Sequence, residues 1–179
     1  MGSSSDSRIM HAAAEILDEF SIPHEDQIIS AHRTPTRLDE YAKHAEKNGF
    51  KVIIAGAGGA AHLPGMIASH TVVPVIGVPI MVYNDKQQKK SKEHKFSAFG
   101  GLDSLLSISE MPSGSPVVTV GVNKALNAGI YALKILGNES DKVRKMLKSH
   151  KDKQHKSVLK ESHELKKMGL KKFVKKKFK

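Results

Sequence analysis

The stretch Val52–Met66, with the sequence VIIAGAGGAAHLPGM, decides the fold that we expect for this chain. Its first three residues form a short apolar run without polar alternation, which is typical of the end of a strand buried in a parallel sheet. The run then breaks into a glycine-rich loop, which lets another molecule approach the backbone closely. His62 follows this loop directly. Because open α/β sheets bind ligands beyond the carboxyl ends of their strands, the stretch predicts a ligand site rather than a plain turn.

Strand and helix patterns alternate on both sides of this stretch. We expect strands at 27–31, 52–54, 73–78 and 116–122, and helices that begin near residues 9, 35, 64, 101 and 124. Alternation at this spacing predicts an α/β fold with a parallel sheet and right-handed crossovers. The serine-rich start at Gly2–Asp6 has no strand before it, although a phosphate-binding loop in such folds normally follows one.

The composition fits one globular domain and excludes several classes of protein. Hydrophobic residues make up 39% of the 179 residues, which is enough for a sizeable core. The chain has no cysteine, so disulfides, thiolate nucleophiles and cysteine metal sites are excluded. The apolar runs are too short to span a bilayer and the start lacks the pattern of a signal peptide, so we expect a soluble cytoplasmic protein.

The net charge of +11 belongs to the end of the chain. Residues 1–137 contain 13 basic and 13 acidic residues, whereas residues 138–179 contain 16 and 5. We therefore expect a neutral α/β domain over 1–137 and a lysine-rich tail over 138–179, which forms either an amphipathic helix or no fixed structure. A polar, lysine-rich segment at about 83–97 interrupts the domain, and we interpret it as a surface insertion.

Three loops at the carboxyl edge of the expected sheet predict a site for a small molecule that bears a phosphate. They are Ser3–Asp6, Ser30–Arg33 and Gly56–His62. The first loop either caps the helix that follows it or binds a phosphate at the N-terminus of that helix. Arg33 adds a cationic donor for an anion, and His32 and His62 can exchange protons near neutral pH. The histidines show neither metal-ligand spacing nor a Ser–His–acid order.

Seven motifs occur in order: GSSSD (2–6), SAHRTP (30–35), IAGAGGAAHLPGM (54–66), PVIGVP (74–79), GLDSLLSI (101–108), MPSG (111–114) and NAG (127–129). Together they resemble the class I N5-carboxyaminoimidazole ribonucleotide mutases of de novo purine biosynthesis, over nearly all of residues 1–137. The resemblance implies a three-layer, flavodoxin-like α/β fold. It also implies a homo-octamer with active sites at subunit contacts, and a reaction that needs neither a metal nor an organic cofactor.

The resemblance also implies a role for each candidate site residue. The family's phosphate-and-ribose loop corresponds to Ser3, Ser5 and Asp6, and its second binding loop to Ser30, Ala31 and Arg33. The loop that lies against the imidazole and the carboxylate corresponds to Ala57, Gly58, His62 and Leu63. His32 matches the histidine that transfers the proton, and we take His32 and His62 as the catalytic pair.

The implied reaction moves a carboxylate from the exocyclic nitrogen of the ribonucleotide to ring C4, by decarboxylation and recarboxylation. His32 would carry the proton between nitrogen and carbon, and an enclosed site would retain the carbon dioxide. The related class II carboxylase, which takes carbon dioxide directly, is the alternative enzyme. That class carries a different sequence in place of AGAGGAAHLPG and typically has lysine where this chain has Arg33.

Two features depart from the family's pattern. The family's first strand precedes the GSxSD loop and lies in the middle of the sheet, but this chain begins at Met1 without it. We therefore expect a piece of a longer protein, with an upstream carboxylase domain as in fused members.

The lysine-rich insertion and tail are the second departure. They favour another alternative, an inactive truncated homologue whose tail binds nucleic acid or another polyanion unspecifically. Elsewhere we expect no nucleic-acid partner, and no membrane partner at all.

Overall fold

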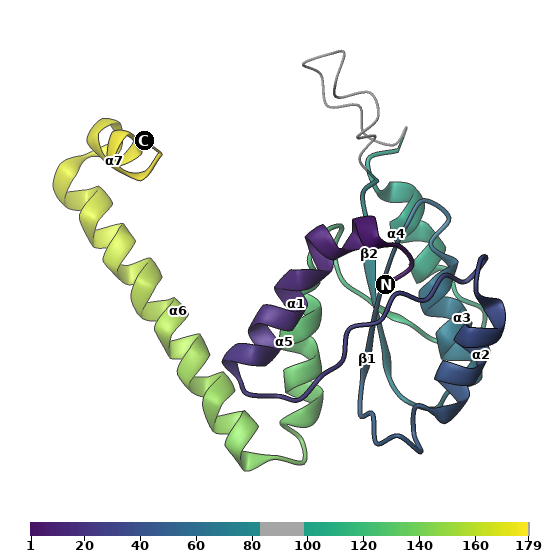
Figure 1. Cartoon of the computed structure of the whole chain (residues 1–179). Coiled ribbons are helices and arrows are strands. Elements are labelled where there is room, and N and C mark those ends of the chain that lie inside the picture. Colours follow the sequence, from purple (N-terminus) through teal and green to yellow (C-terminus); the bar gives the residue numbers. More distant parts are fainter. Residues whose placement is uncertain (83–98, 179) are drawn as a thin grey trace. The chain divides into compact units, whose positions relative to one another are not determined.

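The computed structural model describes residues 1–82 and 99–178, and it divides into two compact units, Met1–Leu136 and Gly137–Lys179. The first unit contains a parallel sheet with helices on both faces (Figure 1), so the predicted three-layer α/β class is confirmed. The predicted insertion at 83–97 lies outside the described residues.

Among the described residues the sheet has three parallel strands in the order β1-β2-β3. They are β1 (Ile53–Gly58), β2 (Val75–Ile80) and β3 (Val118–Thr119). β1 and β2 pair along their whole lengths, from Ile53 opposite Val75 to Gly58 opposite Ile80. Every residue of β2 is buried, as expected for an inner strand of a parallel sheet covered on both faces.

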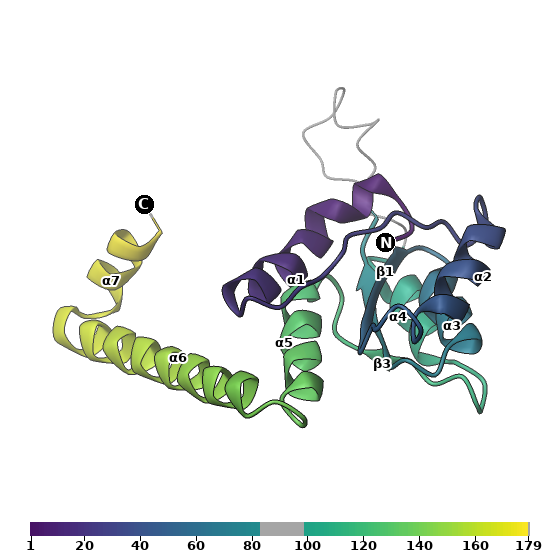
Figure 2. The ribbon, with the colours of Figure 1, turned by 60° about the horizontal axis from the view of Figure 1, so that its bottom comes forward.

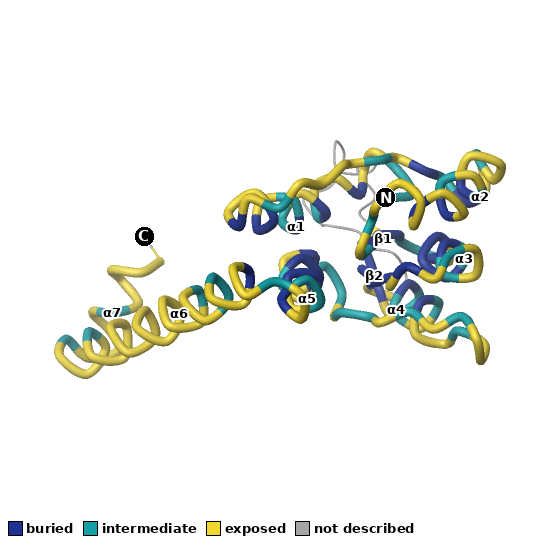
Figure 3. The backbone as a smooth tube through the Cα atoms, turned by 90° about the horizontal axis from the view of Figure 1, so that it is seen from below, coloured by how far each residue is buried: buried dark blue, intermediate teal, exposed yellow. Residues whose placement is uncertain are grey.

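The helices of this unit form the outer two layers. They are the 3₁₀ turn η1 (Ser4–Asp6), α1 (Ser7–Glu19), α2 (Pro35–His44), α3 (His62–His70), α4 (Leu102–Ser109) and α5 (Ala125–Leu136). α1 and α5 pack together on one face of the sheet, and α2, α3 and α4 cover the other (Figure 2). The buried residues gather where these helices face the strands (Figure 3).

Two core clusters follow from the alternation of side chains along the strands. Ile76, Val78 and Ile80 of β2 join the cluster that contains Met10 of α1 and residues of α5. Val75 and the odd-numbered residues of β1 join the cluster beneath α2 and α3. Successive strand residues therefore anchor opposite helix layers, which is how the short sheet holds both.

The predicted strand at 27–31 is wrong, because these residues form no strand in the structure. Ile29 is buried, so the apolar pattern did indicate burial correctly. A strand also needs another strand along its length, but the bonds that the main chain of this segment makes with other backbone groups of the described residues go to Met1 and to the turn residue Thr34. The Met1 amino group donates to the Gln27 carbonyl at 2.8 Å, and the Ile29 N–H donates to the Met1 carbonyl at 2.9 Å.

The central strand extends further than predicted. We expected it to end at Ile54, but β1 continues through the alternating glycines to Gly58. The other strands also shift, from 73–78 to 75–80 and from 116–122 to 118–119, and the helix predicted from Pro64 begins at His62.

Glycine inside β1 is explained by close neighbours: a Cβ on Gly56 would lie 2.3 Å from the Met10 sulfur.

The second unit consists of the helices α6 (Asp141–Met168) and α7 (Leu170–Lys177). The structure thus selects the helical alternative for the tail. Ser140 caps α6 by accepting a hydrogen bond from the Val143 N–H, and Gly169, with φ of 77°, ends it. Across the described part of the chain, no helix combines the length and apolar character needed to cross a membrane.

Gly129 of α5 sets how closely α5 approaches α1. A Cβ at this position would lie 2.4 Å from Cγ2 of Ile16 and 3.1 Å from the Ala13 carbonyl oxygen. We predict that Gly129→Ala lowers the free energy of unfolding by about 1–3 kcal/mol through overpacking, although alanine favours helix formation.

Urea unfolding of the full chain measures this effect, with Asn127→Ala on the exposed side of α5 as the matched control. The control should change stability by less than about 0.5 kcal/mol. A Gly129→Ala variant as stable as the control would contradict the close approach.

Candidate functional site

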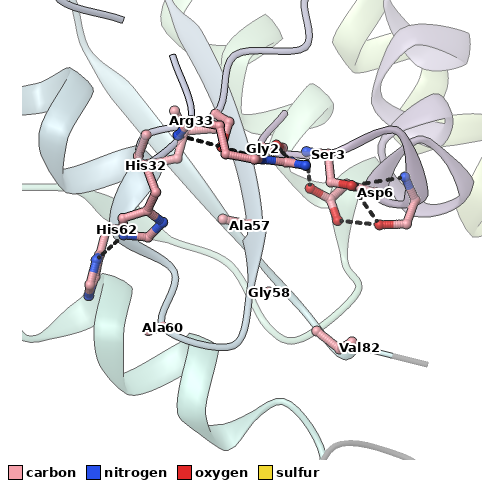
Figure 4. A pocket seen from close by; sticks show the side chains of 14 residues that line it. Gly2, Ser3, Asp6, His32, Arg33, Ala57, Gly58, Ala60, His62 and Val82 are labelled. Carbon is pink, nitrogen blue, oxygen red and sulfur yellow. Dashed lines mark hydrogen bonds between the residues drawn. The ribbon is translucent and has the colours of Figure 1, made fainter. Parts of the chain in front are cut away.

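The structure brings the three predicted loops together around a cavity of about 360 Å³ (Figure 4). Each site residue predicted from the sequence lines it: Ser3, Ser5, Asp6, Ser30, Ala31, His32, Arg33, Ala57, Gly58, His62 and Leu63. The loops converge because the Gly2 N–H donates to the Gly56 carbonyl at 3.1 Å, which ties the serine loop to β1. The cavity thus forms beyond the carboxyl end of β1, where the sequence placed it.

The serine loop forms a capping box rather than an open ring of donors. Asp6 accepts the Ser3 N–H at 2.9 Å, and the Ser3 hydroxyl in turn accepts the Ser5 N–H at 3.4 Å. The Ser5 hydroxyl donates to the Ser3 oxygen at 3.1 Å, so both hydroxyls border the cavity as a connected pair. These bonds cap the 3₁₀ turn η1 rather than α1, whose N-cap residue Asp6 makes no side-chain capping bond, and the hydroxyls remain the groups able to meet an anion.

Asp6 is a buried carboxyl at the edge of this cavity, with 7% of its surface exposed. Burial raises the pKa of Asp6, although the hydrogen bond from the Ser3 N–H and the one from Ser5 act in the opposite direction. Near neutral pH, the ionised carboxylate therefore opposes folding to some extent. A charge kept at such a cost is typical of a binding group.

The second loop holds Arg33 across the mouth of the cavity. Its Nε donates to the Ser30 hydroxyl at 3.1 Å, and its Nη2 donates to the Gly2 carbonyl at 3.2 Å. The turn itself is fixed by Thr34, whose N–H and hydroxyl both donate to the Ser30 carbonyl at 2.9 Å. Arg33 thus links the second loop to the serine loop and places a guanidinium beside the paired hydroxyls.

His32 and His62 face each other on the opposite wall of the cavity. Nε2 of His32 lies 2.9 Å from Nδ1 of His62, and the rings meet edge to face with centroids 5.0 Å apart. One nitrogen donates and the other accepts, so the two rings hold one proton between them. Both rings are exposed to solvent on the cavity side, which leaves their other nitrogens open to a bound molecule.

Three cavity residues were missed by the sequence interpretation: Gly2, Ala60 and Val82. Gly2 and Ala60 belong to the recognised motifs, so their loops already pointed to them. Val82 carries no motif, but it follows β2 by two residues, and strand ends at this edge are expected to line ligand sites. Val82 also packs where a Cβ on Gly58 would stand, 2.6 Å from its Cγ2.

An open parallel sheet with its cavity at the carboxyl ends of the strands defines the flavodoxin-like class of α/β proteins. The crystal structure of Treponema denticola PurE shares this fold, with a TM-score of 0.76 at 24% identity, and the match covers 93% of this chain and 95% of that chain. The family model for AIR carboxylase matches residues 1–157. The chain belongs to the AIR carboxylase family.

Relatives within the family carry two kinds of name. N5-carboxyaminoimidazole ribonucleotide mutase of Thermotoga maritima is 50% identical over 174 residues, which cover 97% of this chain and 94% of the relative. Chloroplastic phosphoribosylaminoimidazole carboxylase of Vigna aconitifolia is 46% identical over 175 residues, which cover 98% of this chain but 29% of the relative. The chain therefore matches one kind of relative almost entirely and the other over less than a third of its length.

The similarity does not stop at residue 137, as the motifs had suggested. The family model continues to residue 157, and the alignment with the Thermotoga maritima relative leaves out only 3% of this chain. The interpretation of the whole tail as a departure from the family is therefore wrong. The motifs could not show this, because all of them lie within residues 1–137.

We predict that Asp6→Asn changes stability with a definite sign. The folded-state pKa of Asp6 is raised, so ionisation disfavours the fold above the unfolded pKa of about 4. Asparagine removes that charge and can still accept the Ser3 N–H. The free energy of unfolding should therefore be higher than that of the wild type at neutral pH, and the difference should disappear in acid.

Asp39→Asn is the matched control of opposite sign. The hydrogen bond from Lys43 lowers the pKa of Asp39, so its carboxylate favours the fold above the unfolded pKa and this contribution is lost as the pH falls. Urea unfolding at neutral and acid pH distinguishes the two variants. If Asp6→Asn and Asp39→Asn lowered the free energy of unfolding equally at neutral pH, the ionised Asp6 carboxylate would not destabilise the fold.

Proposed function

We propose that this protein is a cytoplasmic N5-carboxyaminoimidazole ribonucleotide mutase of purine biosynthesis. The observation that carries the proposal is the His32–His62 pair, which faces the serine loop and Arg33 across one cavity. Relatives that bear this name align with nearly the whole chain at about half identity. A histidine pair opposite hydroxyl and guanidinium donors supports proton transfer on a bound anionic nucleotide.

In this proposal the ribonucleotide phosphate lies against the hydroxyls of Ser3 and Ser5. Asp6 accepts a hydrogen bond from a ribose hydroxyl, which gives its buried charge a partner. Arg33 supplies the cationic donor for the phosphate or the migrating carboxylate. Bound in this way, the base would extend toward the histidines.

The proton step falls to the histidine pair. Loss of carbon dioxide from the exocyclic nitrogen leaves a nitrogen that must gain a proton, and His32 donates it. Ring C4 then attacks the carbon dioxide, and His32 takes the proton that C4 loses, so the histidine ends as it began. His62 accepts or returns the shared proton across the 2.9 Å contact, which keeps His32 competent in both directions.

Carbon dioxide must stay in the site between the two steps, and the apolar residues Ala57 and Leu63 of the cavity would help to retain it. Ala57 and Leu63 are buried, with 7% and 2% of their surfaces exposed, and they line the same cavity as the histidines. The rings themselves are open to solvent in a single chain. We therefore include in the proposal a homo-octamer in which a neighbouring subunit closes the site, and light scattering of the purified protein would give its mass.

Carboxylate tracing tests the activity. Substrate labelled in its carboxylate is supplied to the full chain, and we expect label at C4 of the product with the wild type. His32→Asn should lose roughly 10²–10⁴-fold in rate, the usual contribution of a general acid–base. His44→Asn, an exposed histidine on α2, is the matched control and should keep the wild-type rate.

Two outcomes would refute the proposal as stated. Faster carboxylation of aminoimidazole ribonucleotide from dissolved carbon dioxide than from the labelled substrate would identify the class II carboxylase instead. Absence of turnover by a folded, substrate-binding wild type would favour the inactive homologue.

A further inference from the structure

Asn123 lies in the turn between β3 and α5 and has an unusual backbone conformation. Its φ is 59°, in the left-handed region that residues other than glycine seldom adopt and that asparagine tolerates better than most. Among the described residues, Ser21 is the one other non-glycine residue with a positive φ. Because glycine would make such a turn more easily, asparagine here indicates that its side chain is needed.

The side chain of Asn123 continues the hydrogen bonding of the parallel sheet. The Asn123 N–H donates to the Pro79 carbonyl at 2.8 Å, and its Oδ1 accepts the N–H of Met81 at 3.0 Å. In a parallel ladder, a residue bonds in the same way to the residues before and after its partner, but through its main-chain carbonyl. The amide oxygen of Asn123 thus replaces a main-chain carbonyl opposite Ile80, beyond the end of β3.

The bond to Met81 supports β2 past the point where its pairing with β1 stops. β1 and β2 pair as far as Gly58, which lies opposite Ile80. Met81 is the next residue along, and its N–H is held by Asn123 on the other edge of β2. Asn123 therefore fixes the direction in which the chain leaves the sheet toward Val82.

Val82 forms an apolar wall of the cavity. A Cβ on Gly58 would lie 2.6 Å from Cγ2 of Val82, so this side chain lies directly against the glycine loop. Val82 keeps 44% of its surface exposed, which leaves it able to contact a bound molecule. In Figure 4 it lies beyond Gly58, on the side away from His62. A shift of Val82 would therefore change the space for a ligand without moving the histidine pair.

We propose that Asn123 is a positioning residue of the cavity, whose amide oxygen holds Met81 so that Val82 stays against Gly58. The role rests on the function proposed above, in which the cavity binds the ribonucleotide. Asn123 is not among the described residues that line the cavity, so it acts through Met81 and Val82. Without its oxygen this wall loosens while the histidine pair stays in place, so substrate binding weakens and the proton step is retained.

Three substitutions in the full chain separate the amide oxygen from the backbone. Asn123→Gly keeps the left-handed φ without strain and removes the oxygen. Asn123→Asp keeps an oxygen that can accept the Met81 N–H, so it should restore the wild-type behaviour. Ser21→Gly is the matched control, because it makes the same backbone change at a residue with φ of 53° that does not border the cavity.

Calorimetric titration with aminoimidazole ribonucleotide, in buffer freed of carbon dioxide, measures binding without turnover. Asn123→Gly should bind roughly three- to tenfold more weakly than the wild type, as expected for the loss of one hydrogen bond. Asn123→Asp and Ser21→Gly should bind like the wild type. In the carboxylate-tracing assay, the KM of Asn123→Gly should rise by a similar factor while kcat stays within about twofold of the wild type.

Hydrogen exchange of the Met81 amide, followed by NMR, tests the contact itself. Exchange should become at least about tenfold faster in Asn123→Gly and should stay unchanged in Asn123→Asp. Urea unfolding of each variant shows that it is folded under the assay conditions, so weaker binding is not mistaken for unfolding.

Four results would overturn the proposal. They are equal binding by Asn123→Gly and the wild type, a lowered kcat at unchanged KM, equal weakening by Ser21→Gly, and unchanged exchange of the Met81 amide in Asn123→Gly. A wild type that binds the nucleotide without turnover would refute the mutase activity alone, since the dissociation constants would still decide the role of Asn123. A wild type that binds no nucleotide would refute both.

Discussion

The close approach of α1 to β1 is the constraint on which the site depends. It is possible because Gly56 has no side chain where the Met10 sulfur packs, 2.3 Å from the position a Cβ would take. α1 begins directly after the serine loop, so its position over the sheet also fixes that loop above the end of β1. Gly58 has the same function toward the end of β2, since a Cβ there would lie 2.6 Å from Cγ2 of Val82 and 2.8 Å from the Ile80 carbonyl oxygen. Glycines in this strand thus set the geometry of the site as well as the path of the backbone.

Sequence patterns predicted the site better than they predicted the sheet, and the reason is physical. The site depends on local chemistry at strand ends, where the identity and order of residues such as His32 and His62 carry the information. A strand depends on a neighbour that its own residues do not specify. The segment at 27–31 has the apolar pattern of a strand and buries Ile29, but its main chain bonds to Met1 and to residues of the next turn and helix rather than to a neighbouring strand. Val82 was missed for a related reason, since only the pairing of β2 brings it to the cavity.

The buried charge of Asp6 lowers the stability of the fold but would favour binding of a ligand. Asp6 is buried with its pKa raised, although it accepts two hydrogen bonds, whereas the exposed Asp39 has its pKa lowered by a lysine that neutralises it. A protein selected for stability alone would reverse these environments. Asp6 faces the cavity next to the hydroxyls of Ser3 and Ser5, and the nearby Met1 amino group offsets only part of the effect of its burial. A ligand that donates a hydrogen bond to Asp6 would therefore recover part of the unfavourable free energy of its burial.

The tail shows that charge alone does not determine whether a segment folds. From its 16 basic and 5 acidic residues, composition left both a helix and disorder open. The structure forms a helix because the ends are well placed: Ser140 caps α6, Asp141 lies in its first turn, and Lys166 and Lys167 lie in its last, where the helix dipole favours each charge. Glu161 and Glu164, two of the five acidic residues, then join α6 to α7 through their lysine partners. Asp141, Glu161 and Glu164 thus stand where they organise the two helices.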